Sequence, residues 1–179
     1  MGWSLRRRYP KSSTSNHPDA IAAAKQVTAA DIPTYKPAIV RVRDVENYGE
    51  ADAIKRGHSA IEVKQAKALL KAIETAPKED VGILYRGYDP VKNVSLKPGE
   101  ILNLPFSSFS LDPSTAKIHG ALQLRVEGPV QIFKAYEHSP LPGEQEVFSK
   151  GQFKIKSING NIMTVEQVSP FRQSDLEGK

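Results

Sequence analysis

Residues 145–167, QEVFSKGQFKIKSINGNIMTVEQ, decide the class of fold. Apolar and β-branched residues alternate with polar ones in short runs, and glycines separate the runs. This period of two is typical of strands. The same pattern extends back toward the N-terminus as far as Val81. It predicts strands near residues 82–87, 100–106, 121–126, 130–136, 145–149, 152–158 and 162–167.

The strongest helix of the sequence precedes these strands. Ser59 and Glu62 have the three-residue spacing of a capping box, in which the serine side chain caps the first turn. Apolar residues then recur at helical spacing from Val63 until Pro77. We therefore expect one long amphipathic helix in this segment.

Two shorter helices are expected nearer the N-terminus. Asp19 can cap an Ala-rich helix over residues 20–30, and residues 45–56 predict another helix, which Gly49 weakens. Helices followed by a run of strands indicate an α+β fold rather than an alternating one.

The excess positive charge lies in the first part of the chain. The protein has 179 residues, 39% of them hydrophobic and 25% charged, with a net charge of +5, which fits one soluble domain. Residues 1–40 contribute +4, whereas the other 139 contribute +1. We expect a flexible basic leader over residues 1–18, a short helix and linker over 19–40, one globular domain over 41–169 and a tail over 170–179.

Several classes of protein are excluded by what the sequence lacks. It has no Cys, so it has no disulfide framework, no Cys-ligated zinc and no thiol nucleophile. The four His show no metal-ligand spacing, and neither a Rossmann nor a phosphate-loop motif is present. No apolar run is long enough for a membrane span or a signal peptide. We therefore expect synthesis in a cytoplasm.

A strand with an arginine at its centre is the first candidate for chemistry. In LYRGY, residues 84–88, Arg86 sits in an otherwise apolar strand and Gly87 follows it directly. A guanidinium there needs an anionic partner, and a glycine lets a ligand approach the backbone. The alternative is an edge-strand arginine that pairs with a surface carboxylate.

A serine-rich strand end and a pair of glutamates are the other candidates. PFSSFSLD, residues 105–112, predicts a strand that runs into a turn, whose hydroxyls can orient a carboxylate or simply satisfy the turn backbone. In GEQEV, residues 143–147, a strand starting at Glu144 places Glu144 and Glu146 on one face. Adjacent carboxylates are suited to acid–base work, although solvated glutamates at a strand entry are common.

In this order, the three segments resemble the Arg–Ser–Glu class of mono-ADP-ribosyltransferases, the clostridial-toxin-like family of Glu-x-Glu type. The resemblance covers residues 41–167. Residues 84–87 are similar to the family's aromatic-Arg-Gly strand. Residues 106–112 are similar to its Ser-Thr-Ser element, with Phe109 in place of the usual Thr, and residues 144–148 are similar to its Glu-x-Glu-Val segment. The resemblance implies an ADP-ribosyltransferase-like fold, with N-terminal helices packed on a mainly antiparallel core of two β-sheets.

The resemblance also implies NAD as the substrate and a role for each matching residue. Arg86 would hold the phosphate and ribose of NAD, and the backbone of Gly87 would contact the nicotinamide carboxamide. Glu146 would be the catalytic carboxylate that binds the ribose 2′-hydroxyl. Ser108 would hold Glu146 in place, with Ser110 in support.

Further residues are implied to bind NAD or the acceptor. Glu144 would accept the proton of an arginine acceptor, and Tyr48 is the candidate for an aromatic contact to NAD. Phe109 or Phe106 would stack on the nicotinamide or belong to the core. The loop over residues 136–143 would contact the target protein.

The resemblance predicts an enzyme, a glycosyltransferase that moves ADP-ribose from NAD to a protein arginine without a metal ion. Its partners would be NAD and the target protein, with no membrane. The alternatives are an NAD glycohydrolase, a non-catalytic virion or assembly module, and a nucleic-acid binder, against which the nearly neutral body argues. We expect synthesis in a bacterial or phage-infected cell, with virion association or delivery as an effector left open.

Overall fold

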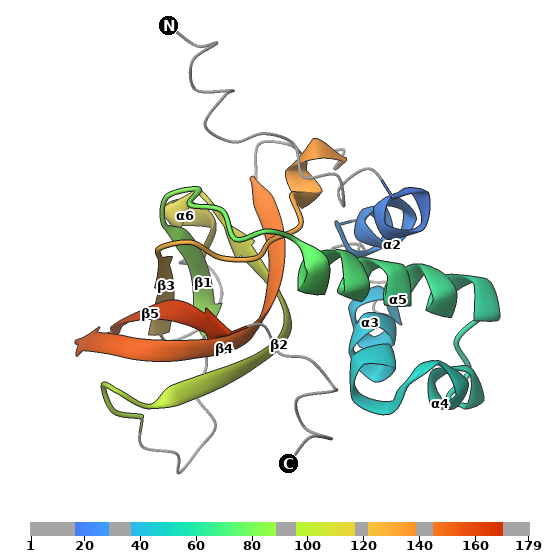
Figure 1. The fold of residues 1–179 in the computed structure, drawn as a ribbon, viewed down its shortest axis with the longest axis horizontal. Helices are drawn as coiled ribbons and strands as arrows, with labels where there is room; N and C mark the ends of the chain where they lie inside the picture. The colour runs from blue at the N-terminus through green and yellow to red at the C-terminus, as the bar shows by residue number, and fades with distance from the viewer. Residues whose placement is uncertain (1–16, 29–36, 89–95, 117–121, 139–144, 170–179) are drawn as a thin grey trace, which may run out of the picture.

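The computed structural model describes residues 17–28, 37–88, 96–116, 122–138 and 145–169. Within these ranges a group of helices lies beside a curved sheet (Figure 1). The elements are α2 (Pro18–Thr28), α3 (Pro37–Tyr48), α4 (Glu50–Lys55), α5 (Ala60–Thr75), β1 (Leu84–Tyr88), β2 (Ile101–Ser110), α6 (Pro113–Ala116), β3 (Leu122–Glu127), η3 (Ala135–Glu137), β4 (Glu146–Asn159) and β5 (Ile162–Ser169).

The long helix α5 starts as the capping box predicts. The Ser59 hydroxyl accepts the backbone N–H of Glu62 at 3.2 Å and donates to its carboxylate at 2.9 Å. The short helix α2 begins two residues before its predicted start and packs along α5. The helix expected over 45–56 is wrong in its bounds: α3 begins at Pro37, eight residues earlier, and Gly49, with a φ of 88°, separates it from α4.

Helices α2, α3 and α5 bury one face each in a shared apolar core. This helical core also takes in three rings from the sheet side of the molecule, Phe106, Phe133 and Phe148. Burial of an amphipathic face is what stabilises short helices such as α2. None of the helices in the described ranges is both long and apolar enough to cross a membrane.

The strands form one closed sheet in the order β1-β2-β4-β5-β3. All neighbouring pairs are antiparallel except β3 and β5, which are parallel. The expected mainly antiparallel pairing is confirmed, whereas the expected division into two sheets is wrong. The closing contact between β1 and β2 is a single pair, Tyr85 opposite Ser110, and the strands enclose a second apolar core, the barrel core.

Four of the seven expected strands also differ from the structure. Residues 130–136 form no strand; Val130 and Phe133 make single bridges, and η3 follows. The strands expected over 145–149 and 152–158 are one strand, β4, which passes through Gly151 at a φ of 134°. Strand β2 continues through the serines to Ser110 instead of turning there.

A β-bulge divides β2 and shifts its pairing with β4 by one residue. Leu104 lies opposite Gly151, but the next partners are Ser107 and Ser149. Two residues of β2 therefore face one residue of β4, as in other bulges. The side-chain period is two, so this single step exchanges the faces to which the following residues of β2 point.

Candidate active site

Three of the predicted residues meet where β1 and β4 flank β2. The guanidinium Nη1 of Arg86, on β1, donates to the backbone carbonyl of Ser108 at 2.7 Å. The Ser108 hydroxyl donates to Oε2 of Glu146, the first residue of β4. All three residues are partly exposed. The strand order thus joins an arginine, a serine and a carboxylate that lie far apart in the sequence.

Ser110 lies on the same face of β2 as Ser108 and directly opposite Glu146 in the register. It is 6% exposed, and its hydroxyl accepts the backbone N–H of Asp112 at 3.0 Å. The Asp112 carboxylate in turn accepts the N–H of Ser114 at 3.0 Å, in the first turn of α6. Ser110 therefore stabilises the turn that ends the strand beside the site.

Both phenylalanines of the serine segment lie in apolar cores. Phe109 is 2% exposed in the barrel core, with its ring centroid 6.4 Å from that of Phe153. Phe106 is fully buried in the helical core, 4.9 Å from Phe148. The sequence left two roles open for these rings, stacking on the nicotinamide or packing in the core. Their burial supports packing in the core. The Arg86 guanidinium lies 6.0 Å from the Phe109 ring centroid.

Two further predicted residues are described by the structure. Gly87 lies in β1, opposite Gln123 of β3. Tyr48 ends α3 and is 49% exposed, and the Arg56 guanidinium lies 3.8 Å above its ring centroid. Glu144 lies outside the described residues, and β4 begins after Gln145, whose φ is 49°.

The loop expected to contact a target protein is described only over its first residues. Burial, followed by the nearby carboxylates of Glu137 and Glu79, raises the pKa of Tyr136. Among the described residues, no group of His, Asp and Glu side chains has the arrangement of a metal site.

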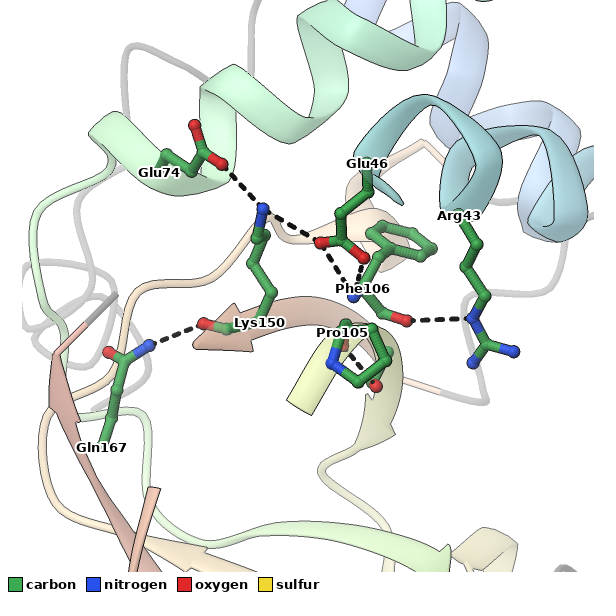
Figure 2. Close-up of polar contacts among 8 residues, drawn as sticks. Arg43, Glu46, Glu74, Pro105, Phe106, Lys150 and Gln167 are labelled. Atoms are coloured by element: carbon green, nitrogen blue, oxygen red, sulfur yellow. Dashed lines mark hydrogen bonds and ion pairs between the residues drawn. The ribbon is translucent and has the colours of Figure 1, made fainter. Parts of the chain in front are cut away.

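Behind the site lies a buried ionic cluster that the sequence did not reveal. Lys150 Nζ lies 2.9 Å from the Glu46 carboxylate and 2.7 Å from that of Glu74. Figure 2 shows Lys150 reaching from β4 to Glu46 on α3 and Glu74 on α5. In the sequence Lys150 looks like the other lysines of this strand, Lys154 and Lys156, so no local pattern marks it as buried.

The Glu46 carboxylate also contacts the backbone of β2. Both of its oxygens accept the N–H of Phe106, at 3.0 and 3.1 Å. The carbonyl of Phe106 accepts from Nε of Arg43 at 3.4 Å, as Figure 2 shows. Two side chains of α3 therefore bind both backbone groups of Phe106, a residue of the bulge.

The fold is that of known ADP-ribosyltransferases. No known protein family and no curated protein matches the sequence. The ADP-ribosyltransferase Vis in complex with agmatine matches with a TM-score of 0.59 at 19% identity, covering 88% of this chain and 76% of that chain. The structure of C3stau2 from S. aureus with NAD matches with a TM-score of 0.56 at 16% identity, covering 96% of this chain and 93% of that chain. The type III effector XopAI from Xanthomonas axonopodis pv. citri matches with a TM-score of 0.57 at 17% identity, covering 86% of this chain and 71% of that chain. The ADP-ribosyltransferase-like fold expected from the sequence is therefore confirmed.

Proposed function

We propose that this protein transfers ADP-ribose from NAD to an arginine of a target protein and releases nicotinamide. The observation that carries the proposal is the contact of Arg86, Ser108 and Glu146 at the junction of three strands. These are the residue types that the chemistry requires, and they meet on the fold of ADP-ribosyltransferases, one of them solved with NAD.

The Glu146 carboxylate is the group that acts on the ribose. When the glycosidic bond between C1′ and the nicotinamide nitrogen breaks, its electron pair leaves with neutral nicotinamide, and positive charge develops on the ribose. A carboxylate held beside that charge stabilises the transition state more than the ground state. The hydrogen bond from Ser108 fixes the orientation of the carboxylate before NAD binds.

Arg86 is proposed to bind the pyrophosphate of NAD. A guanidinium offers several N–H donors in one plane, and one of them is already fixed by the carbonyl of Ser108. Such paired donors suit the oxygens of a phosphate group. The same hydrogen bond links the position of the phosphates to that of Ser108, and through it to Glu146.

Arginine is proposed as the acceptor because Glu144 precedes Glu146 by two residues. A guanidinium nitrogen attacks C1′ and must lose a proton, which Glu144 would accept. The complex of Vis with agmatine supports this choice, since agmatine carries the guanidinium group of an arginine side chain. The similarity to the effector XopAI supports a target in a second cell.

The test uses the full chain with labelled NAD and either polyarginine or agmatine as acceptor. Glu146→Gln should lower nicotinamide release by about two orders of magnitude or more, because it removes the negative charge. Glu144→Gln should keep nicotinamide release and lose transfer of the label. Glu127→Gln is the matched control, since this partly exposed glutamate on β3 pairs with Lys156 at 3.7 Å; it should change neither readout.

Two outcomes would contradict the proposal. Release of nicotinamide without transfer to any acceptor would identify an NAD glycohydrolase, with water as the acceptor. A wild-type protein that neither cleaves NAD nor transfers its label would exclude the enzyme altogether and favour a binding or assembly module.

A further inference from the structure

The bulge in β2 decides which face carries Ser108. Before the bulge, Leu102 and Leu104 point into the barrel core. If the strand continued without the bulge, every second residue after them, Ser108 included, would also point into the barrel. The one-residue step instead sends Phe109 into the barrel core and turns Ser108 to the face of Glu146. The site therefore exists only in the bulged register.

The bulge leaves backbone groups that β4 does not bind. Pro105 has no N–H, and neither Pro105 nor Phe106 has a partner in the register between β2 and β4. A buried backbone group without a hydrogen bond is costly, so the bulge needs another partner. Glu46 accepts the N–H of Phe106 and Arg43 donates to its carbonyl, from positions one turn apart on α3.

Pairing with Lys150 offsets the free-energy cost of burying the Glu46 carboxylate. The side chains of Glu46 and Lys150 are each 3% exposed, and a lone ion in such a place is strongly disfavoured. Lys150 is the residue of β4 that falls within the step in register. Its ammonium pairs with Glu46 and Glu74, and its carbonyl accepts from Gln167 at 2.9 Å (Figure 2).

We infer that Glu46 is a positioning residue for the active site, acting through the backbone of Phe106. Its carboxylate holds the one-residue step that places Ser108, two residues further on, beside Glu146. Lys150 pairs with that carboxylate and holds it in place. The inference rests on the proposed function, since it assigns Glu46 a part in the same reaction, but the geometry of the bulge can be measured without NAD.

The experiment compares three variants of the full chain. Glu46→Ala removes the acceptor of the Phe106 N–H, whereas Glu46→Gln keeps an oxygen that can accept it. Glu74→Ala is the matched control, because it removes a carboxylate from Lys150 without touching Phe106. For each variant, kcat and KM for NAD cleavage and the hydrogen-exchange rate of the Phe106 amide are measured.

We expect Glu46→Ala to lower kcat at least tenfold while KM for NAD changes less than about threefold, since the pairing of β1 with β3 keeps Arg86 in place even when Ser108 shifts. The Phe106 amide should exchange at least tenfold faster than in the wild type. Glu46→Gln should recover most of kcat and of the amide protection. Glu74→Ala should leave both within about twofold, even where it lowers the melting temperature.

Equal losses of kcat in Glu46→Ala and Glu74→Ala would overturn the inference, because Glu46 would then contribute only to stability. An unchanged Phe106 amide in Glu46→Ala would overturn it as well. If the wild-type protein does not cleave NAD, the proposed function fails on that result alone. The exchange of the Phe106 amide and the amide chemical shift of Ser108 in the three variants then still decide whether Glu46 holds the bulge.

Discussion

The two halves of β2 differ in what covers them. In the half before the bulge, exposure alternates: Ile101 is 45% exposed and Asn103 is exposed, while Leu102 and Leu104 fill the barrel core. In the half after it, over residues 107–110, Ser108 is partly exposed and the other three residues are buried. One face packs into the barrel, and the other lies on the side of the helices and of Glu146.

This difference shows why the candidate site lies on the second half. Charges and hydrogen bonds that are partly removed from water interact more strongly than exposed ones. The helices bury Phe106 and Phe148 on that side of the sheet, and the bulge decides which later residues of β2 point to the same side. A strand that alternates regularly along its whole length would place hydroxyl and carboxylate on opposite faces.

The largest effect should come from deleting the ring that links β2 to the helices at the bulge, where the second half of the strand begins. Phe106→Ala should lower the free energy of unfolding by about 3–5 kcal/mol, because the ring is fully buried against Phe148. Asn103→Ala, in the exposed part of the first half, should stay within about 0.5 kcal/mol. Urea denaturation measures both, and similar losses in the two variants would erase the distinction between the halves.

A somewhat smaller effect should come from removing the ammonium opposite the bulge. Lys150→Met should cost about 3 kcal/mol, near the lower end for a broken buried pair, because the Glu74 side chain is 28% exposed and can turn to water. Adding Glu46→Gln should restore part of the loss, since no buried carboxylate then remains unpaired. Lys154→Met, on an exposed position of β4, should cost less than about 0.5 kcal/mol.

The outcome for this pair is read as a double-mutant cycle from denaturation curves. Losses that simply add would mean that Glu46 and Lys150 do not depend on each other. The ion pair between Glu46 and Lys150 would then contribute little to the free energy of unfolding. Only the burial of Phe106 would distinguish the bulged part of β2 from the first half.

Local signals predicted α5, α2 and most strands, but they missed the first eight residues of α3 and the whole of α6. The capping box of Ser59 and the period of two after Val81 depend on neighbours a few residues apart, so they can be read from the sequence. Arg86, Ser108 and Glu146 could be identified because their strand motifs follow one another in a recognisable order. The structure then brings all three into contact.

Long-range features could not be predicted in this way. Lys150 contacts Glu74 across 76 residues, and the glutamates on α3 and α5 look in sequence like solvated helix faces. The closure of the sheet depends on pairing of β3 with β5, which no local pattern encodes. Residues 130–136 have a strand pattern, but their apolar side chains are divided between the helical and barrel cores.

The smallest effects should separate two adjacent serines. Ser107 is 2% exposed and donates to the Pro105 carbonyl at 2.7 Å, so Ser107→Ala should cost about 1 kcal/mol of stability and leave NAD cleavage within about twofold. Ser108→Ala should do the reverse. It should change stability by less than about 0.5 kcal/mol and lower kcat about tenfold or more, because Glu146 loses the hydrogen bond from Ser108.

Denaturation curves and NAD cleavage measured on the same preparations test this pair. The two serines have the same side chain and neighbouring positions, so only the face to which each points can distinguish them. If Ser107→Ala lost activity and Ser108→Ala lost stability, the second half of β2 would be out of register by one residue. The bulge would then lie elsewhere, and Glu46 would have no part in the site.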